Sequence, residues 1–275
     1  MKADLAAKLA ALPPLAVGNA ELRTPRCKIC AASTRVFDIV DSNKCGGDTY
    51  NFYRFGFSGI PVCYYRCTRC RFLFTDFFDD WTNQDFADFI YNADYGKVDP
   101  EYASIRPKRC AAQVASVLTG AERLSILDYG SGAGVFAAEL RAQGYAKCGT
   151  YDPFSSPEKP TGKFDVITCF EVMEHTQTPI ETMRDIASYL GDAGCLIFST
   201  GVQPPEIEQQ RANWWYVSPR NGHLSIHTNA SLLALAQACE MQFCPGSFGF
   251  AAMRRTNPKG EWNVIASRCA APWHG

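Results

Sequence analysis

Four of the thirteen cysteines form two C-x-x-C pairs, Cys27–Cys30 and Cys67–Cys70, which 36 residues separate. Two thiolates at this spacing can hold one metal ion in a tight turn, and two such turns complete a tetrahedral zinc site. The zinc would be structural, because four cysteine ligands leave no coordination position for a substrate. Cys45 and Cys63 are alternative ligands. A redox dithiol is the other interpretation, but it does not explain why the motif occurs twice.

A glycine-rich stretch is the second group of residues with evident chemistry. The sequence LSILDYGSGAG at 124–134 carries an apolar run into Asp128 and continues through Gly130, Gly132 and Gly134. Glycine permits a positive φ and lets a ligand approach where a Cβ would intrude. The pattern favours a loop that binds an adenosine-containing cofactor, and a purely structural turn is the alternative. The dinucleotide fingerprint G-x-G-x-x-G fails, since its third glycine would fall on Val135.

A carboxylate 18 residues after Gly134 supports a nucleoside ligand. Asp152 ends the stretch 146–151, a predicted second strand, where it can accept hydrogen bonds from both ribose hydroxyls. Only eleven residues, PFSSPEKPTGK, precede the next predicted strand, and their prolines exclude a regular helix. We therefore expect the third strand of the sheet to be absent, with Pro153 and Phe154 covering the adenine instead.

The elements after residue 102 alternate between strand and helix, which predicts a Rossmann-like, doubly wound α/β fold with a mostly parallel sheet. We predict strands at 124–129, 146–151, 164–167, 195–200 and 262–267, the last antiparallel. Helices are expected at 106–119, 135–144, 178–190 and 229–240, the third with a capping box formed by Thr178 and Glu181. The expected domains are an N-terminal arm (1–25), a zinc ribbon (26–80) with strands at 50–57 and 62–65, a connector (81–105) and a catalytic domain (106–275).

The segment KFDVITCFEVMEH at 163–175, together with the glycine-rich stretch, resembles the class I S-adenosylmethionine-dependent methyltransferases. It is most similar to small-molecule methyltransferases of ubiquinone and sugar biosynthesis. The resemblance to a methyltransferase that bears an N-terminal zinc ribbon covers about residues 27–270, and it implies S-adenosylmethionine as cofactor and tyrosines that close its pocket. The expected cofactor-binding residues are Tyr91, Tyr95, Asp128, Gly130, Ser131, Gly132, Gly134, Asp152, Pro153, Phe154 and Phe170.

Methyl transfer is an in-line displacement, so the enzyme positions two reactants and removes a proton from the acceptor where the acceptor carries one. Glu171 and His175 follow the fourth strand and should face the site, because ligands bind beyond the carboxyl ends of such strands. His223 lies in a later segment that also contains His227, and Trp214 to Tyr216 there are expected to line an acceptor. The candidate bases are His175, His223 and Glu171, and a structural role is the alternative for each histidine.

Composition limits the partners of the chain. Its 275 residues carry a net charge of −1, which gives no overall attraction to nucleic acid or to an anionic membrane. No apolar run is long enough to cross a membrane, and the many cysteines in apolar contexts suit reduced thiols in a cytoplasm. We therefore expect a cytoplasmic enzyme with a small-molecule substrate. The alternatives are an RNA methyltransferase that uses the basic ribbon, and a non-catalytic interaction protein that binds cofactor without turnover.

Overall fold

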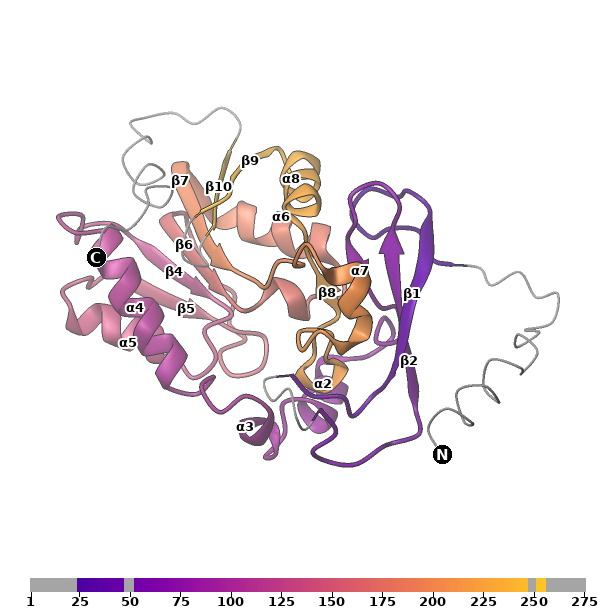
Figure 1. Ribbon diagram of the computed structural model, residues 1–275. Helices are drawn as coiled ribbons and strands as arrows, with labels where there is room; N and C mark the ends of the chain where they lie inside the picture. Colours follow the sequence, from indigo (N-terminus) through magenta and orange to yellow (C-terminus); the bar gives the residue numbers. More distant parts are fainter. Residues whose placement is uncertain (1–23, 47–51, 247–250, 256–275) are drawn as a thin grey trace, which may run out of the picture.

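The computed structural model describes residues 24–46 and 52–246, and the backbone of 251–255. The expected strand at 262–267, His274 and almost all of the N-terminal arm lie outside the described residues. The described part of the molecule contains two sheets (Figure 1). One has six strands and carries the glycine turn, residues 130–134; the other has four strands and is formed mainly by the N-terminal segment. None of the described helices is both long enough and apolar enough to span a membrane.

The larger sheet has the order β5-β4-β6-β7-β10-β9. Its parallel strands are β4 (Ile126–Tyr129), β5 (Cys148–Tyr151), β6 (Phe164–Phe170) and β7 (Leu190–Ser199). β10 (Ala251–Arg255) runs antiparallel to both β7 and β9 (Met241–Cys244). β5 lies at the edge, and residues 153–163 contribute no named strand, so the expected loss of the third strand is confirmed.

Helices cover both faces of this sheet (Figure 1). On one face, α4 (Ile105–Val117) and α5 (Val135–Ala142) pack with Ile126 and Val166; on the other, α6 (Pro179–Tyr189) and α8 (Asn229–Ala238) pack with Leu127. Neighbouring strand residues therefore belong to opposite cores, as the period of a β-strand requires. The predicted Rossmann-like fold is confirmed.

The start of α6 differs from the prediction. The side chain of Thr178, the N-cap residue, makes no capping hydrogen bond, so the expected capping box with Glu181 is wrong. Instead the Thr178 amide donates to the hydroxyl of Thr176 at 3.2 Å. This bond satisfies a donor at the helix entrance by a different local side chain.

The smaller sheet is antiparallel and has the order β1-β2-β3-β8. Its strands are β1 (Thr34–Asp41), β2 (Pro61–Cys67), β3 (Leu73–Phe74) and β8 (Ser225–Ile226). The strand expected at 62–65 is confirmed within β2, whereas the strand expected at 50–57 is wrong, because residues 52–55 form a turn. The fourth strand comes from a segment about 150 residues further along the chain, so the N-terminal sheet is completed by the catalytic part. The domain limits stay a prediction.

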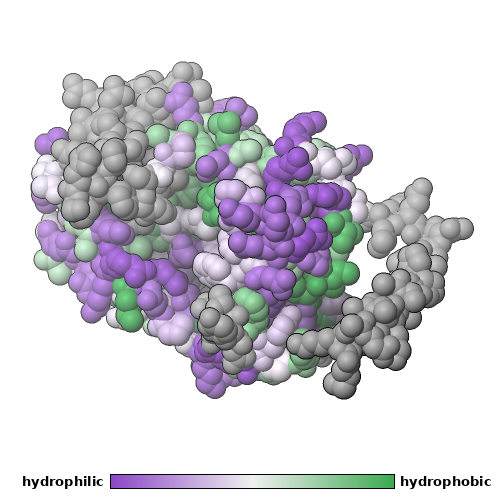
Figure 2. All heavy atoms as spheres, viewed as in Figure 1, coloured by the Kyte–Doolittle hydropathy of each residue, from purple (hydrophilic) through white to green (hydrophobic). Residues whose placement is uncertain are grey.

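Short helices connect the two sheets. α2 (Asn83–Phe89) and α3 (Tyr95–Val98) belong to the connector, and α7 (Ile207–Gln210) follows β7. Three single-turn 3-10 helices complete the described elements: η1 (Met173–His175), η2 (Arg211–Asn213) and η3 (Pro219–Asn221). Figure 2 shows hydrophilic residues gathered around α7, where Glu208 pairs with Arg35 and Arg66 of the N-terminal sheet.

Candidate active site

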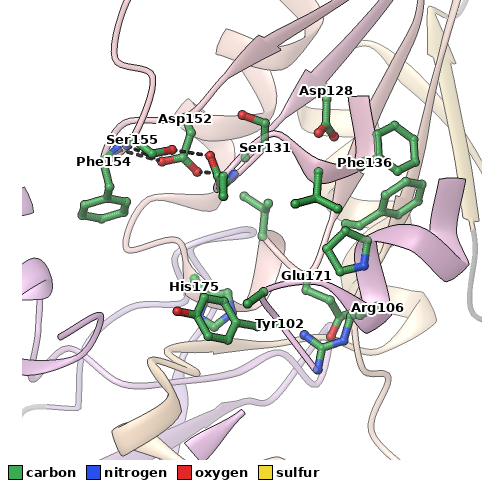
Figure 3. Close-up of a pocket in the computed structure, with 18 of the residues that line it drawn as sticks. Tyr102, Arg106, Asp128, Ser131, Phe136, Asp152, Phe154, Ser155, Glu171 and His175 are labelled. Atoms are coloured by element: carbon green, nitrogen blue, oxygen red, sulfur yellow. Dashed lines mark hydrogen bonds between the residues drawn. The ribbon is translucent and has the colours of Figure 1, made fainter. Parts of the chain in front are cut away.

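A cavity of about 460 Å³ opens beyond the carboxyl ends of β4, β5 and β6. This is where parallel α/β sheets bind ligands, and the volume is that of a small-molecule site. The connector, the start of α4, the glycine turn and the loops after β5 and β6 all contribute to its wall (Figure 3). Of the residues expected to bind cofactor, the lining contains Tyr91, Tyr95, Asp128, Gly130, Ser131, Gly132, Asp152, Pro153, Phe154 and Phe170.

The glycine turn takes the left-handed conformation at all three glycines, with φ of 78° at Gly130, 50° at Gly132 and 75° at Gly134. A Cβ on Gly130 would lie 2.3 Å from Cγ2 of Val172, so no larger residue fits there. A Cβ on Gly132 would meet nothing within 4 Å, which leaves its backbone open to the cavity. Gly134 is not part of the lining and serves instead as the N-cap of α5.

Asp152 ties the glycine turn to the loop that replaces the third strand. Its Oδ2 accepts the amide of Gly132 at 3.0 Å, and its Oδ1 accepts the amides of Phe154 and Ser155 at 2.9 Å (Figure 3). The hydroxyl of Ser155 donates back to the carbonyl of Gly132. The loop after β5 is thus shaped by the same carboxylate that faces the cavity.

Two buried polar atoms beneath the turn have no hydrogen-bond partner among the described residues. They are Oδ2 of Asp128 and Oγ of Ser131, both from residues that line the cavity. The other oxygen of Asp128 accepts the hydroxyl of Thr168 at 3.0 Å, and burial raises the pKa of this carboxyl to about 7. Buried polar atoms are nearly always satisfied in folded proteins, so this pair indicates a ligand with polar groups.

Glu171 lies at the opposite wall, directly after β6. Its backbone has a φ of 54°, which is uncommon for a residue with a side chain and marks a constrained position. Oε1 accepts the hydroxyl of Ser199 at 2.7 Å. Burial and the neighbouring charge of Glu174 raise the pKa of Glu171 to about 7. A group with this pKa can exchange protons with a ligand at neutral pH.

His175 and His223 also line the cavity, and their rings lie 5.2 Å apart between centroids. Nδ1 of His175 is 2.9 Å from the carbonyl of Gly222, and Nδ1 of His223 is 2.8 Å from the carbonyl of Tyr216. Because a carbonyl can only accept, each Nδ1 must carry the proton, and each Nε2 keeps its lone pair. Burial lowers the pKa of both imidazoles, so both are neutral at pH 7.

A family model described as a methyltransferase domain matches residues 102–240, which are 139 of the 275 residues. The chain belongs to this methyltransferase family. The match confirms the enzyme class that the sequence predicted, a methyltransferase. The matched range begins in the connector and ends after α8, so it contains the glycine turn, both loops of the cavity and all the candidate bases.

Solved structures of other methyltransferases are similar to the chain at low identity. Magnesium protoporphyrin IX methyltransferase from Synechocystis PCC 6803, solved with bound SAH, is 12% identical with a TM-score of 0.38 over 54% of this chain and 83% of that one. The mitomycin 7-O-methyltransferase MmcR is 14% identical with a TM-score of 0.45 over 62% and 60%. The 1,6-didemethyltoxoflavin-N1-methyltransferase of Burkholderia thailandensis is 14% identical with a TM-score of 0.44 over 62% and 84%. No curated protein matches the sequence.

The sequence did not single out two further residues in or next to the cavity. Glu174, within the same motif as Glu171, is fully buried and accepts the hydroxyls of Tyr216 at 2.6 Å and Thr200 at 3.0 Å. Arg106 lines the cavity from α4 and forms a bidentate pair with Asp99. Arg106 reaches the cavity only through long-range packing, so no local sequence signal marked it, whereas Glu174 lies in the quoted motif but does not itself line the cavity.

The expected apolar wall for an acceptor is wrong. Trp214, Trp215 and Tyr216 do not belong to the cavity lining, and Tyr216 is buried against Glu174 instead. His227 is also buried away from the cavity, where its ring stacks on Phe72 at 4.9 Å between centroids. Of the residues that the sequence analysis named in this segment, only His223 lines the cavity.

The four paired cysteines come together away from the cavity. Their sulfur atoms lie 3.7 Å apart for Cys27 and Cys70, 3.5 Å for Cys30 and Cys67, and 3.6 Å for Cys30 and Cys70. A tetrahedral zinc ion with bonds of about 2.3 Å places its sulfur ligands about 3.8 Å apart, so the cluster fits this ion. Cys45 and Cys63 do not belong to the cluster, which removes them as alternative ligands.

Proposed function

We propose that the chain binds S-adenosylmethionine in this cavity and transfers its methyl group to a small-molecule acceptor, such as a sugar or a natural-product intermediate. The observation that carries the proposal is the open backbone at Gly132 beside two unsatisfied buried atoms, Oδ2 of Asp128 and Oγ of Ser131. Together they form a cradle that needs a polar, close-fitting ligand. The cofactor would supply an electrophilic methyl group on a positively charged sulfur.

The charge of the cavity suits this cofactor. Asp128, Asp152 and Glu171 contribute acidic groups to the lining, whereas the charge of Arg106 is already paired with Asp99. A cationic ligand is favoured in such surroundings. In our proposal Asp152 accepts the ribose hydroxyls, Pro153 and Phe154 cover the adenine, and Tyr91, Tyr95 and Phe170 enclose the remainder.

The acceptor would lie at the wall formed by Glu171, His175 and His223. We assign proton removal to Glu171, because its pKa of about 7 matches a general base at neutral pH. The two Nε2 lone pairs can accept hydrogen bonds from acceptor hydroxyls or amines and so orient the acceptor for in-line attack. His175 and His223 are thereby proposed to bind the acceptor rather than to ionise.

We infer a structural zinc ion at Cys27, Cys30, Cys67 and Cys70, in support of which the sulfur distances fit a tetrahedron. We also propose that the protein acts in the cytoplasm, since none of the twelve described cysteines forms a disulfide. A small-molecule acceptor is preferred to RNA because arginines of the N-terminal sheet form ion pairs within the chain, as Arg35 and Arg66 do with Glu208.

Calorimetry with S-adenosylhomocysteine tests the cofactor proposal. We expect micromolar binding to the wild type and binding at least tenfold weaker in Asp152→Ala, while Asp192→Ala, near the start of β7 and outside the cavity lining, keeps wild-type affinity. No binding to the wild type, or tight binding of NAD instead, contradicts the proposal. Screening small-molecule acceptors for release of S-adenosylhomocysteine then identifies the substrate, and salt-sensitive micromolar binding of RNA would favour the RNA alternative.

A further inference from the structure

Both active-site histidines depend on one irregular segment, residues 214–223. The carbonyls that fix their tautomers belong to Gly222 and Tyr216 of this segment, and His223 itself is its last residue. The segment contains only the single-turn helix η3, so no regular strand or long helix fixes its course. What holds these residues in place therefore decides where the two Nε2 lone pairs point.

A buried lysine of the N-terminal sheet region holds the first half of the segment. Lys44 is only 2% exposed, and its ammonium donates to the carbonyls of Trp214 at 3.2 Å and of Val217. Its Nζ also lies 4.4 Å from the centre of the Phe52 ring. Among the described residues no carboxylate pairs with it, and burying an unpaired charge is costly. The geometry points to a positional role that an apolar residue could not fill.

Neighbouring backbone groups strengthen this contact. The amide of Arg220 donates to the carbonyl of Lys44 at 3.1 Å, and the amide of Gly46 donates to the side chain of Asn221 at 2.7 Å. A Cβ on Gly46 would lie 2.9 Å from the carbonyl oxygen of Trp215, so the two stretches of chain are in close contact. Residues 44–46 and 214–221 therefore interlock through both backbones.

Tyr64 of β2 holds the end of the segment. This tyrosine is fully buried, and its hydroxyl donates to the carbonyl of His223 at 2.8 Å. The chain then continues into β8, which pairs with β3, and the amide of Thr75 donates to the carbonyl of Leu224 at 3.1 Å. Residues of the N-terminal segment therefore hold the backbone of His223 itself and the residues before and after it.

The cofactor side of the cavity is built differently. The amides of Gly130 and Ser131 donate to the carbonyl of Tyr151, and Asp152 binds the amide of Gly132. These bonds join β4, β5 and the loop after β5, all of the larger sheet. The two halves of the cavity therefore rest on different parts of the chain.

We propose that the N-terminal module, residues 24–46 and 52–75, supports the acceptor half of the active site from outside the cavity lining, with Lys44 and Tyr64 as positioning residues for His175 and His223. This inference rests on the proposed function and deepens it. It predicts different effects on two measurable properties. Removing the contacts of Lys44 or Tyr64 impairs methylation of the acceptor, whereas the affinity for the cofactor is retained.

The test compares Tyr64→Phe and Lys44→Met with Tyr65→Phe, a matched control on the same strand whose ring contacts Phe74 instead. Nitrogen-15 NMR of labelled histidines reports on the imidazoles without any acceptor. We expect the resonances of His175 and His223 to shift in both variants and to stay unchanged in the control. The dissociation constant for S-adenosylhomocysteine should remain within about twofold of wild type, and kcat with an acceptor found by screening should fall at least tenfold.

Each outcome separates the two proposals. Unshifted histidine resonances with unchanged kcat would overturn the inference. A loss of S-adenosylhomocysteine affinity that parallels the loss of activity would also overturn it, because the module would then merely support the whole fold. Failure of the wild type to bind S-adenosylhomocysteine contradicts the proposed function instead, and the NMR comparison still decides whether Lys44 and Tyr64 set the imidazoles. Tyr64→Phe removes one oxygen only, so it remains informative even where Lys44→Met unfolds.

Discussion

The hydroxyl of Ser199, at the end of β7, donates to Oε1 of Glu171 at 2.7 Å across the wall of the cavity. The bond favours the ionised carboxylate and so lowers the pKa of Glu171. Burial and the charge of Glu174 act in the opposite direction and prevail, which leaves the pKa at about 7. Ser199 therefore adjusts the pH range over which Glu171 can accept a proton.

Removing this hydroxyl should move the pH profile. If Glu171 is the base, wild-type kcat rises with pH through about 7 as the carboxyl ionises. In Ser199→Ala the ionised form loses a hydrogen bond, so the rising limb should shift upward by about one pH unit. Steady-state kinetics between pH 5.5 and 9 measure the shift. A profile that does not move, or that moves to lower pH, argues against Glu171.

Glu171→Gln should lower kcat by about 10² or more, the usual contribution of a general base, and should remove the limb near pH 7. The amide keeps the size of the side chain, so the affinity for S-adenosylhomocysteine should stay close to wild type. Single-turnover assays with the acceptor from the screen provide the measurement. A variant that retains both rate and pH limb would transfer the role to His175 or His223.

Gly130→Ala should weaken the cofactor site for a steric reason. The added Cβ would lie 2.3 Å from Cγ2 of Val172 at a residue with a φ of 78°. Gly120 is a matched control, because its φ is 80° and nothing lies within 4 Å of its Cβ position. Gly120→Ala should cost only the strain of the left-handed conformation, about 1 to 2 kcal/mol.

The difference between the two variants isolates the contact. Denaturant unfolding should show a larger loss of stability for Gly130→Ala, and calorimetry should show at least tenfold weaker binding of S-adenosylhomocysteine in that variant alone. Equal effects of the two substitutions would mean that Val172 moves aside and that the close approach is unimportant.

The sequence predicted the cofactor half of the site because that half is local in the chain. The turn from Asp128 to Gly134 and the carboxylate of Asp152 lie at the ends of adjacent parallel strands, so their spacing alone places them together. The prolines after Asp152 predicted the missing third strand for an equally local reason, since they forbid the helix that would lead to it.

The acceptor half could not be predicted in this way. Tyr64 meets His223, and Lys44 meets Val217, across more than 150 residues of chain. The pairing of β3 with β8 brings these segments together, and no periodicity in either segment reveals it. The expectation for Trp214 to Tyr216 failed for the same reason: Trp214 and Tyr216 pack in a core shared with β1 and β2, and Trp215 is 43% exposed.

Metal analysis of the full chain should give one zinc ion per molecule. Cys67→Ser should lose most of it, because three thiolates hold the ion less tightly, and stability should fall with it. Cys63→Ser is the matched control, since Cys63 lies on the same strand outside the cluster. Unchanged zinc in Cys67→Ser would refute the site.

A second group of possible ligands consists of Glu174, His175 and His223, whose ligating atoms are within 4.8 Å of one another. An ion that remains in Cys67→Ser but is lost in His223→Ala would be bound there.

His227 should make the protein sensitive to acid. Burial lowers the pKa of this imidazole to about 4, whereas an unfolded histidine titrates near 6.5. Between these values the unfolded state binds the additional proton, so stability falls as pH decreases from about 6.5 to about 4. The full difference corresponds to about 3 kcal/mol. The raised pKa values of Asp128 and Glu171 act in the opposite direction, because those groups take up protons in the folded state first.

The contribution of His227 is therefore measured as a difference, by chemical denaturation of the wild type and of His227→Phe from pH 7 to pH 4.5. Phenylalanine preserves the ring that stacks on Phe72 and cannot be protonated, so acidification should destabilise the wild type more than the variant. Parallel curves for the two proteins would show that His227 is protonated in the folded state as readily as in the unfolded one.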